Sequence, residues 1–587
     1  MEKWIEVRKG GSFAQLGKKY GLDPVLFRIL CNRGVVTQAD IETYLYGGRE
    51  KLHDPHLLKD GEVAAELLAD AIAQGKKIRI IGDYDIDGVN ASYILLKGLR
   101  RCGAIADAAI PDRMKDGYGI NENLIQAAAE AGTELIMTCD NGIAALDAIS
   151  FAKQKGMTVI VTDHHEIPYR MDESGTQIWL RSEADAIVNP KQQDCAYPYK
   201  ELCGATVAWK VLQLLYEKMD IPVEQADEFI ENVGFATVGD VMNLTGENRI
   251  LVKLGLQALE QTKNPGMKAL IAQTGLQDRK ISSYHVGFLL GPCINASGRL
   301  DTARRSLALL MEEDLTAAAE LARELVELNE SRKSMTLQQT ELAMQRVVEQ
   351  GLEQNKVLVV YLEECHESLA GIIAGRLRER YHRPVIVLTK GEDGVKGSGR
   401  SIEEYSMFDE LTAVAELFTK YGGHPMAAGM SLTEENAALL GQRLNENCRL
   451  TEDDLVEKVY IDVVMPMSYV TEELVYDLSL LEPCGKGNTK PIFAEREIRV
   501  KRATRVGRLQ NVLKLQLLTR DNRQVSGIFY DDIDRFFGYL EEKFSKEDVM
   551  AMCEGRPNGI TFSAIYDPSV NTYGGNREIQ MIIRRYC

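Results

Sequence analysis

The sequence predicts an α/β protein built from a parallel-sheet domain, a long connecting helix, a second α/β domain and a small β-barrel. Three observations lead to this fold class. Strands and helices alternate over residues 78–165. A polar stretch rich in alanine and glutamate, residues 314–352, lacks proline and has helical spacing. Short strands with alternating polarity follow residue 456.

The alternating region 78–165 contains three strand-like runs, IRIIG, ELIMTC and TVIVT, with stretches of helical spacing between them. This pattern is typical of a parallel sheet whose strands are joined by crossover helices. Each of the three strands runs directly into acidic residues, and the third also runs into two histidines. The side chains are Asp83, Asp85 and Asp87 after the first strand, Asp140 after the second, and Asp163, His164 and His165 after the third.

These side chains are expected to converge, because parallel strands bring their carboxyl ends to one edge of a sheet and ligands bind there. Asp240, in a loop of the mostly helical region 204–275, is a further candidate. Carboxylates and imidazole suit Mn²⁺ or Mg²⁺ better than zinc. So many like charges at one edge would repel, and a cation offsets that repulsion.

A simpler explanation exists for each motif taken alone. An aspartate after a strand is commonly a helix N-cap or a turn former, and a pair of histidines is commonly a polar surface feature. The combination favours a metal site, because three consecutive strands end in acidic residues. In addition, the two histidines are adjacent although the whole chain has only eight histidines.

The second half of the chain contains a second α/β region and then the short strands. Two glycine-rich segments, KGSGRS and YGGHPMAAG, follow strands of the second region. The short strands after residue 456 predict a barrel of the OB-fold type. The predicted divisions are a lead segment at 1–55, the parallel-sheet domain at 56–312, the connecting helix at 313–352, the second α/β domain at 353–452 and the barrel at 453–587.

Composition narrows the function classes. The 587 residues carry a net charge of −18, which argues against a protein that holds nucleic acid by general electrostatic attraction. The eleven cysteines form no CxxC pair, so neither a disulfide framework nor a structural zinc site is indicated. No stretch approaches the roughly 18 apolar residues of a membrane span, so a cytoplasmic location without membrane partners is expected.

Four ordered segments, DYDIDG, TCDNG, TDHH and VGDVMNL, resemble the signature motifs of the DHH phosphoesterases. The segments LHDPHLLKD, PDRMKDGYG, LCGATVAWK and GPCINASGRL narrow the resemblance to RecJ-like exonucleases. The second α/β region is similar to a DHHA1 domain, and LEPCGKGNTKPIF looks like the opening of the RecJ barrel. The resemblance implies a nuclease that removes 5′-mononucleotides from the 5′ end of single-stranded DNA, in DNA repair and recombination.

The resemblance also implies a site with two Mn²⁺ or Mg²⁺ ions that ready a water for attack on phosphorus. His165 would face the scissile phosphate. One departure concerns Ile81, because related enzymes usually carry histidine there, and the ion at Asp85 is therefore predicted to bind more weakly. The implied ligands are Asp87, Asp140, His164 and Asp240 for one ion and Asp85 and Asp140 for the other, with Asp83 and Asp163 as catalytic carboxylates nearby.

Substrate contacts follow from the same resemblance. Arg113, Arg299, Ser398 and Arg400 would contact the 5′ phosphate or nearby backbone, and His424 would line the same cleft. Arginine suits this role because its planar fork donates two hydrogen bonds to phosphate oxygens. Taken alone, the KGSGR segment would be a plain turn.

A basic stripe is predicted on the first strand of the barrel, where alternation would place several cations on one face for incoming DNA. An ordinary solvated strand face is the alternative. The stripe residues are Arg496, Arg499, Lys501, Arg502 and Arg505.

Two other functions stay open from the sequence. One is a DHH/DHHA1 phosphodiesterase for short oligonucleotides or cyclic dinucleotides, which would generally lack the barrel. The other is a catalytically impaired DNA-binding scaffold, for which Ile81 argues slightly. For the leading hypothesis the candidate partners are single-stranded DNA, a helicase and a single-strand-binding protein.

Overall fold

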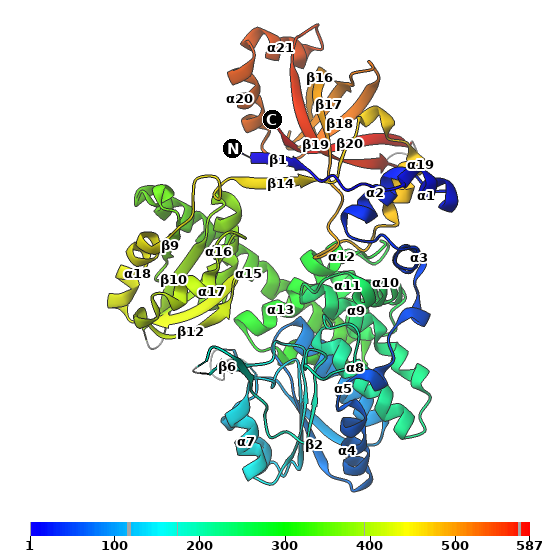
Figure 1. The fold of residues 1–587 in the computed structure, drawn as a ribbon, viewed down its shortest axis with the longest axis vertical. Helices are drawn as coiled ribbons and strands as arrows, with labels where there is room; N and C mark the ends of the chain where they lie inside the picture. Colours follow the sequence, from blue (N-terminus) through cyan, green and yellow to red (C-terminus); the bar gives the residue numbers. More distant parts are fainter. Residues whose placement is uncertain (1, 114–118, 173, 392–393, 573–576) are drawn as a thin grey trace. The chain divides into compact units, whose positions relative to one another are not determined.

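The computed structural model describes residues 2–113, 119–172, 174–391, 394–572 and 577–587 (Figure 1). The chain forms two compact units. One unit is Arg49–Glu457, and the other combines Met1–Gly48 with Lys458–Cys587. Within the described residues, no helix is both long and apolar enough to cross a membrane.

The first α/β domain is built on a five-stranded parallel sheet with the order β3-β2-β4-β5-β8. The chain steps from β2 to β3 on one side and then returns to β4 on the other, so the strand order reverses between β2 and β4. Ligands bind in the crevice at such a reversal. The strands are β2 (Lys77–Ile81), β3 (Ile105–Ala109), β4 (Leu135–Cys139), β5 (Thr158–Thr162) and β8 (Ala186–Val188).

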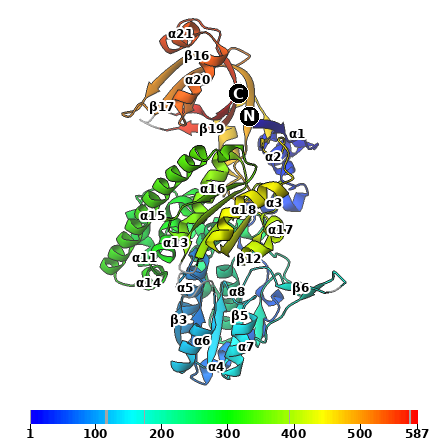
Figure 2. The ribbon, with the colours of Figure 1, turned by 90° about the vertical axis from the view of Figure 1, so that its left-hand side faces the viewer.

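Helices cover both faces of this sheet, which explains why strands such as β4 and β8 are buried along their whole length. Ile80 packs in the core shared with α4, α5 and α8, whereas the next residue, Ile81, packs in the core of α6 and α7. A hairpin of β6 (Tyr169–Met171) and β7 (Gln177–Trp179) projects from the domain (Figure 2). The helices are α4 (Gly61–Ala73), α5 (Ile86–Arg101), α6 (Glu122–Glu130), α7 (Leu146–Gln154) and α8 (Gly204–Lys218).

A helical region follows and ends in the long connecting helix α15 (Leu315–Glu349), which confirms the helix predicted from the sequence. Gly234 and Gly255 allow α9 and α10 to pack backbone against backbone, because a Cβ on either glycine would lie under 3 Å from the Cα of the other. The remaining helices are α9 (Ile230–Gly239), α10 (Gly246–Leu259), α11 (Pro265–Gln273), α12 (Ser283–His285), a π-helix (Val286–Leu290), α13 (Gly291–Leu300) and α14 (Arg304–Met311).

The second α/β domain has a mixed sheet with the order β12-β13-β11-β10-β9. Both glycine-rich segments lie on strands of this sheet, so the plain turn that KGSGR alone would suggest is wrong. The elements are β9 (Leu358–Tyr361), α16 (Glu367–Tyr381), β10 (Val385–Gly391), β11 (Gly394–Arg400), α17 (Met407–Thr412), β12 (Phe418–His424), β13 (Ala427–Leu432) and α18 (Glu434–Asn447).

The other unit contains the predicted barrel, which closes because β16 pairs with both β17 and β19. Its strands and helices are β14 (Glu457–Ile461), β15 (Val463–Val464), α19 (Glu472–Ser479), β16 (Phe493–Val506), β17 (Val512–Leu518), β18 (Gln524–Phe529), α20 (Ile533–Lys543), α21 (Lys546–Glu554), β19 (Thr561–Asn571) and β20 (Glu578–Tyr586).

The amino-terminal segment belongs to the same unit as the barrel. Its strand β1 (Glu2–Glu6) pairs with β14, and Leu26 and Phe27 are fully buried in the barrel core. A lead segment separate from the barrel was the expectation from the sequence, which has no signal for a contact between residues more than 400 positions apart. The helices of this segment are α1 (Phe13–Tyr20), α2 (Pro24–Asn32) and α3 (Gln38–Tyr46).

Candidate metal centre

The carboxyl ends of β2, β4 and β5 carry the predicted acidic and imidazole side chains, and these strands are neighbours in the sheet. The strand order reverses between β2 and β4, and this is the position at which ligands bind in sheets of this kind. Asp240 reaches the same place from the C-terminal end of α9, where it is the residue that caps the helix. The structure therefore brings together side chains from four separate segments.

His164 lies at the centre of this cluster. Its Nε2 atom is 3.1 Å from Asp140 Oδ1, 3.6 Å from Asp87 Oδ2 and 3.7 Å from Asp240 Oδ2. The ligand atoms of Asp87, His164 and Asp240 all lie within 4.8 Å of one another, which suits the coordination of one cation.

Asp140 lies beside His164 of this group and also belongs to a second group of candidate ligands. The ligand atoms of Asp83, Asp85 and Asp140 also lie within 4.8 Å of one another, and a third group combines Asp140 with both histidines. Asp140 has a left-handed backbone with a φ of 61°. Its carboxylate thus belongs to two groups of candidate ligands.

The amino terminus of α8 holds Asp87 in place. The backbone N–H groups of Gly204 and Ala205 donate to the Asp87 carboxylate at 2.6 and 2.8 Å. A Cβ on Gly204 would lie only 2.6 Å from the Cβ of Asp140, so glycine lets α8 approach the cluster. Sequence reasoning missed these donors, because main-chain N–H groups leave no side-chain signal.

Asp85 combines a capping role with its place in the cluster. It is the N-cap of α5, and its Oδ1 atom accepts hydrogen bonds from the backbone N–H groups of Asp87 at 2.9 Å and Gly88 at 3.1 Å. The simpler explanation of an aspartate after a strand therefore holds for one carboxylate oxygen. It does not conflict with a cation at the other oxygen.

Asp163 forms a hydrogen bond with the side chain of His165. Its Oδ1 atom accepts a 2.7 Å hydrogen bond from Nδ1 of His165, and its Oδ2 atom accepts one from the backbone N–H of Ile143. Burial opposes ionisation of this carboxyl, but the hydrogen bond and charge of His165 lower its pKa to about 2. Burial likewise opposes the charge on His165, and Asp163 nevertheless raises its pKa to about 9.

The buried carboxylates fit a divalent cation. Burial first, and then the neighbouring carboxylates, raise the pKa values of Asp83 and Asp140 well above the ordinary range. Both ring nitrogens of His164 are buried and make no hydrogen bond with any described residue. Oxygen ligands with imidazole suit Mn²⁺ or Mg²⁺, and a cation would offset the repulsion that now favours protonation.

Ile81 offers no ligand at this site. Its side chain is fully buried in the core of α6 and α7, and its carbonyl accepts a 3.0 Å hydrogen bond from Asn141 Nδ2. The group that contains Asp85 is therefore formed by carboxylates alone.

Three of the predicted phosphate contacts meet at α16. Nη1 of Arg299, on α13, donates to the carbonyl of Ser368 in the first turn of α16 at 2.9 Å. A Cβ on Gly371, one turn later, would lie 2.7 Å from Arg400 Nη2 and 2.8 Å from Ser398 Oγ. The glycine therefore allows both side chains from β11 to lie directly on the helix.

The other two predicted contacts are more distant. Arg400, Ala427 and His424 are in register across β11, β13 and β12, which puts His424 about 10 Å from Arg400 on the same face of the sheet. The Arg113 guanidinium lies 5.0 Å from the centre of the Tyr84 ring, beside the first aspartate motif. Residues 114–118 of the PDRMKDGYG segment lie outside the described residues.

The predicted stripe on β16 does not form a single face. A register shift between Val500 and Arg502 adds a residue to the strand, which reverses the alternation beyond it. Arg505 consequently lies over the Phe537 ring of α20, on the opposite face from Arg502. All the stripe residues are nevertheless exposed.

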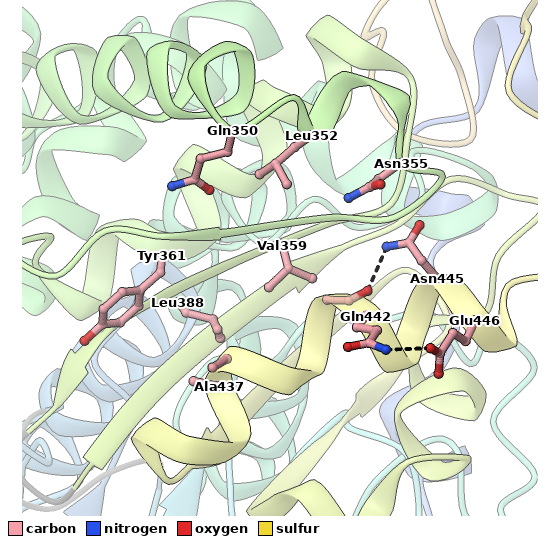
Figure 3. Close-up of a pocket in the computed structure, with 12 residues that line it drawn as sticks. Gln350, Leu352, Asn355, Val359, Tyr361, Leu388, Ala437, Gln442, Asn445 and Glu446 are labelled. Atoms are coloured by element: carbon pink, nitrogen blue, oxygen red, sulfur yellow. Dashed lines mark hydrogen bonds between the residues drawn. The ribbon is translucent and has the colours of Figure 1, made fainter.

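A separate cleft of about 640 Å³ lies between β9, α18 and the end of α15 (Figure 3). Its amide Asn445 is already engaged, since Oδ1 accepts from the N–H of Lys356 and of Val357 and Nδ2 donates to the Gly441 carbonyl. The cleft contains none of the clustered carboxylates or histidines, so it is not the candidate site.

Three family models match the chain. The DHH family N-terminal domain matches residues 77–233, the DHHA1 domain matches residues 354–449, and the RecJ OB domain matches residues 461–585. The cluster described above lies mainly in the first of these segments.

Curated relatives match over most of the chain. The single-stranded-DNA-specific exonuclease RecJ of Bacillus subtilis is 33% identical over 97% of this chain and 68% of that protein. The Escherichia coli protein of the same name is 34% identical over 80% of this chain and 83% of its own length.

A solved structure of RecJ from Thermus thermophilus in complex with Mn²⁺ is similar over 100% of this chain and 79% of its own, with a TM-score of 0.80 and 26% identity. A structure of exonuclease RecJ bound to manganese covers 67% of this chain and 96% of its own, with a TM-score of 0.58 and 31% identity.

Proposed function

Since the chain belongs to the RecJ family, we propose that it is a metal-dependent exonuclease that degrades single-stranded DNA from the 5′ end to 5′-mononucleotides. The observation that carries this proposal is the position of Asp140. Its carboxylate belongs both to the group of Asp83 and Asp85 and to the group of His164 and His165, and its Oδ1 atom is 3.1 Å from His164 Nε2.

Two cations would be held by these groups. Asp87, His164 and Asp240 would bind one, Asp85 would bind the other, and Asp140 would be shared, with Asp83 beside the second ion. Mn²⁺ or Mg²⁺ bound there supplies Lewis acidity to phosphoryl oxygens and lowers the pKa of a coordinated water. The buried, oxygen-rich donor set supports either ion.

His165 would face the scissile phosphate. The hydrogen bond from its Nδ1 to Asp163 fixes the orientation of the ring and directs Nε2 toward the substrate side. Although burial opposes the charge, the hydrogen bond to Asp163 raises the pKa of the ring, which favours the protonated form that can donate a hydrogen bond to a phosphate oxygen. Asp163 acts through His165 and is therefore a positioning residue.

The 5′ end would be recognised on the other side of the crevice. Arg299, Ser398 and Arg400 converge on α16, and Arg113 lies beside the first aspartate motif. His424 lines the same sheet face as Arg400. The exposed cations of β16 would also bind the backbone of the single strand.

The remaining parts of the proposal are cellular. The enzyme would act in the cytoplasm in DNA repair and recombination, with a helicase that exposes single strands and a single-strand-binding protein as candidate partners. The match of residues 461–585 to the RecJ OB domain speaks against a short-oligonucleotide phosphodiesterase without a barrel.

The test uses the purified full chain with MnCl₂ or MgCl₂ and labelled single-stranded, duplex, 5′-blocked and dinucleotide substrates. Among the long substrates, we expect only the single strand to release mononucleotides. The variants Asp140→Ala and His165→Ala should lose this activity. The exposed Asp172→Ala is the matched control and should keep full activity. Degradation of only short or cyclic dinucleotides would contradict the proposal.

A further inference from the structure

Asn295, on α13, supports the loop that joins β2 to α5. This loop carries Asp83 and Asp85, and Asp87 lies in the first turn of α5. The first N–H groups of a helix have no acceptor within the helix itself. In α5 the first of them, from Ile86, is accepted by the side-chain oxygen of Asn295 at 2.8 Å, and the next two are accepted by Asp85. No role was predicted for Asn295 from the sequence.

The backbone of the same loop lies directly on α13. A Cβ on Gly298 would lie only 2.3 Å from the carbonyl oxygen of Tyr84. Gly298 is inside the helix, so a left-handed backbone is not the reason for glycine there. The close approach of the loop is the reason. At the start of α13, a Cβ on Gly291 would lie 3.1 Å from Cδ1 of Ile86.

These three contacts come from one face of α13. Positions 291, 295 and 298 follow the spacing i, i+4 and i+7, which repeats on a single helix face. The face contacts Tyr84 and Ile86, the two neighbours of Asp85 in the chain. The backbone is therefore held by α13 on both sides of Asp85.

Asp87 has its own support, from a different helix. The N–H groups of Gly204 and Ala205 at the start of α8 donate to its carboxylate. The Asp85 carboxylate instead accepts from N–H groups of its own helix, α5. Loss of the contact with α13 would therefore displace Asp85 and leave Asp87 in place. Because the two aspartates belong to different groups of candidate ligands, the effect on metal binding should be selective.

We propose that Asn295 is a positioning residue, which acts through the backbone of Ile86 to hold Asp85 in the group that it forms with Asp83 and Asp140. The ligand of this group is a divalent cation, Mn²⁺ or Mg²⁺, so the inference rests on the proposed function. Outer partners of this kind orient metal ligands, and their loss costs about 10- to 100-fold in metal affinity or activity.

The test uses three variants of the full chain and a matched control. Asn295→Leu removes the acceptor at similar size, whereas Asn295→Asp keeps an oxygen acceptor at the same place. Gly298→Ala pushes against the Tyr84 carbonyl from the same helix face. The control, Asn558→Leu, removes an amide oxygen that accepts the backbone N–H of Ile560 in the other unit.

Mn²⁺ binding to the DNA-free chain is measured by electron paramagnetic resonance. We expect Asn295→Leu and Gly298→Ala to raise the Kd of the weaker site about 10- to 100-fold and to leave the stronger site unchanged. Asn295→Asp should bind Mn²⁺ at both sites at least as tightly as wild type. Asn558→Leu should match wild type.

Cleavage of a 5′-phosphorylated dinucleotide gives a second measurement. At limiting Mn²⁺, kcat of Asn295→Leu should fall about 10- to 100-fold with little change in KM. Saturating Mn²⁺ should restore kcat, because mass action refills the weakened site. A role confined to folding would not respond to the metal concentration in this way.

An unchanged weaker site in Asn295→Leu would overturn the inference, and so would equal weakening of both sites. Asn295→Asp as weak as Asn295→Leu would also overturn it, because the acceptor would then not matter. Melting in EDTA shows whether each variant folds. If Asn295→Leu does not fold, Gly298→Ala decides, and an unchanged weaker site in that variant overturns the inference.

Failure of this inference can be distinguished from failure of the proposed function. A wild-type chain that binds Mn²⁺ and cleaves single strands, with variants that bind Mn²⁺ as wild type does, would overturn the role of Asn295 alone. Selective loss of the weaker site in a chain that cleaves no single-stranded DNA would support Asn295 and overturn the exonuclease. A wild-type chain that binds no Mn²⁺ would overturn both.

Discussion

Nδ1 of His165 donates a 2.7 Å hydrogen bond to Asp163, a carboxylate that is almost completely buried and also accepts from the backbone of Ile143. Asp163 fixes the ring without itself belonging to any of the three groups of candidate ligands, whereas His165 belongs to one of them. The relationship separates positioning from metal binding and can be tested on its own.

Asp163→Asn should lower kcat by about 100- to 1000-fold with little change in KM, because the amide no longer fixes the charged ring of His165. Steady-state cleavage of a 5′-phosphorylated single strand measures this. Mn²⁺ binding, followed by electron paramagnetic resonance, should be retained. Failure of the variant to bind Mn²⁺ would show instead that Asp163 is a ligand.

Asp140→Asn should lower cleavage by at least about 1000-fold, since the residue is shared by the groups that would hold both ions. The metal-free variant should melt at a higher temperature than metal-free wild type, because burial and neighbouring carboxylates disfavour the Asp140 charge. Calorimetry in EDTA measures this. A lower melting temperature would contradict the electrostatic account of the cluster.

Titration of the DNA-free chain with Mn²⁺ should reveal two unequal sites. The weaker one should be the group of Asp83 and Asp85, where position 81 provides isoleucine in place of an imidazole. Mn²⁺ should also support higher activity than Mg²⁺. Two equally tight sites in the absence of DNA would refute the prediction.

Glu231 should make stability depend on pH. Burial raises its pKa from 4.5 to about 7, so the folded state binds this proton more tightly than the unfolded state. Stability from this group is present at low pH and is lost as pH rises from about 4.5 to 7. Glu231→Gln should therefore raise the free energy of unfolding at pH 8, by at most about 3 kcal/mol.

Thermal unfolding at pH 5 and pH 8 measures this difference. The side chain accepts a 2.8 Å hydrogen bond from Thr262, which glutamine can still accept. Glu224→Gln, at an exposed position of the same region, is the matched control and should leave the free energy of unfolding unchanged at both pH 5 and pH 8. Equal effects of the two variants would argue against the pH dependence assigned to Glu231.

Charge reversal at Arg499, Lys501 and Arg502 should weaken binding to long single strands and flatten its salt dependence. The slope of log K against log salt concentration should fall by about 0.7 for each phosphate that the variant no longer neutralises. Cleavage of a dinucleotide should be unaffected. The measurement is anisotropy of a labelled 40-mer across a salt series. Unchanged binding would mean that these exposed cations of β16 form an ordinary solvated surface.

Strand patterning explains why the metal cluster could be predicted from the sequence. Asp83, Asp140 and Asp163 each follow a β-strand, and parallel strands have only one edge at which their carboxyl ends can meet. The β16 stripe failed as a single face for the opposite reason. One extra residue near Arg502 reverses the alternation, and nothing in a run of polar residues marks such a bulge.

The sequence by itself determined the ligand types, their order and the edge of the sheet where they meet, because strand period and chain direction are local properties. Only the tertiary structure decided what surrounds them. Three features depend on contacts between distant segments. They are the N–H groups of α8 that donate to Asp87, the contact of Arg400 with Gly371, and the packing of residues 2–48 with the barrel. Such contacts are set by packing, which local patterns do not encode.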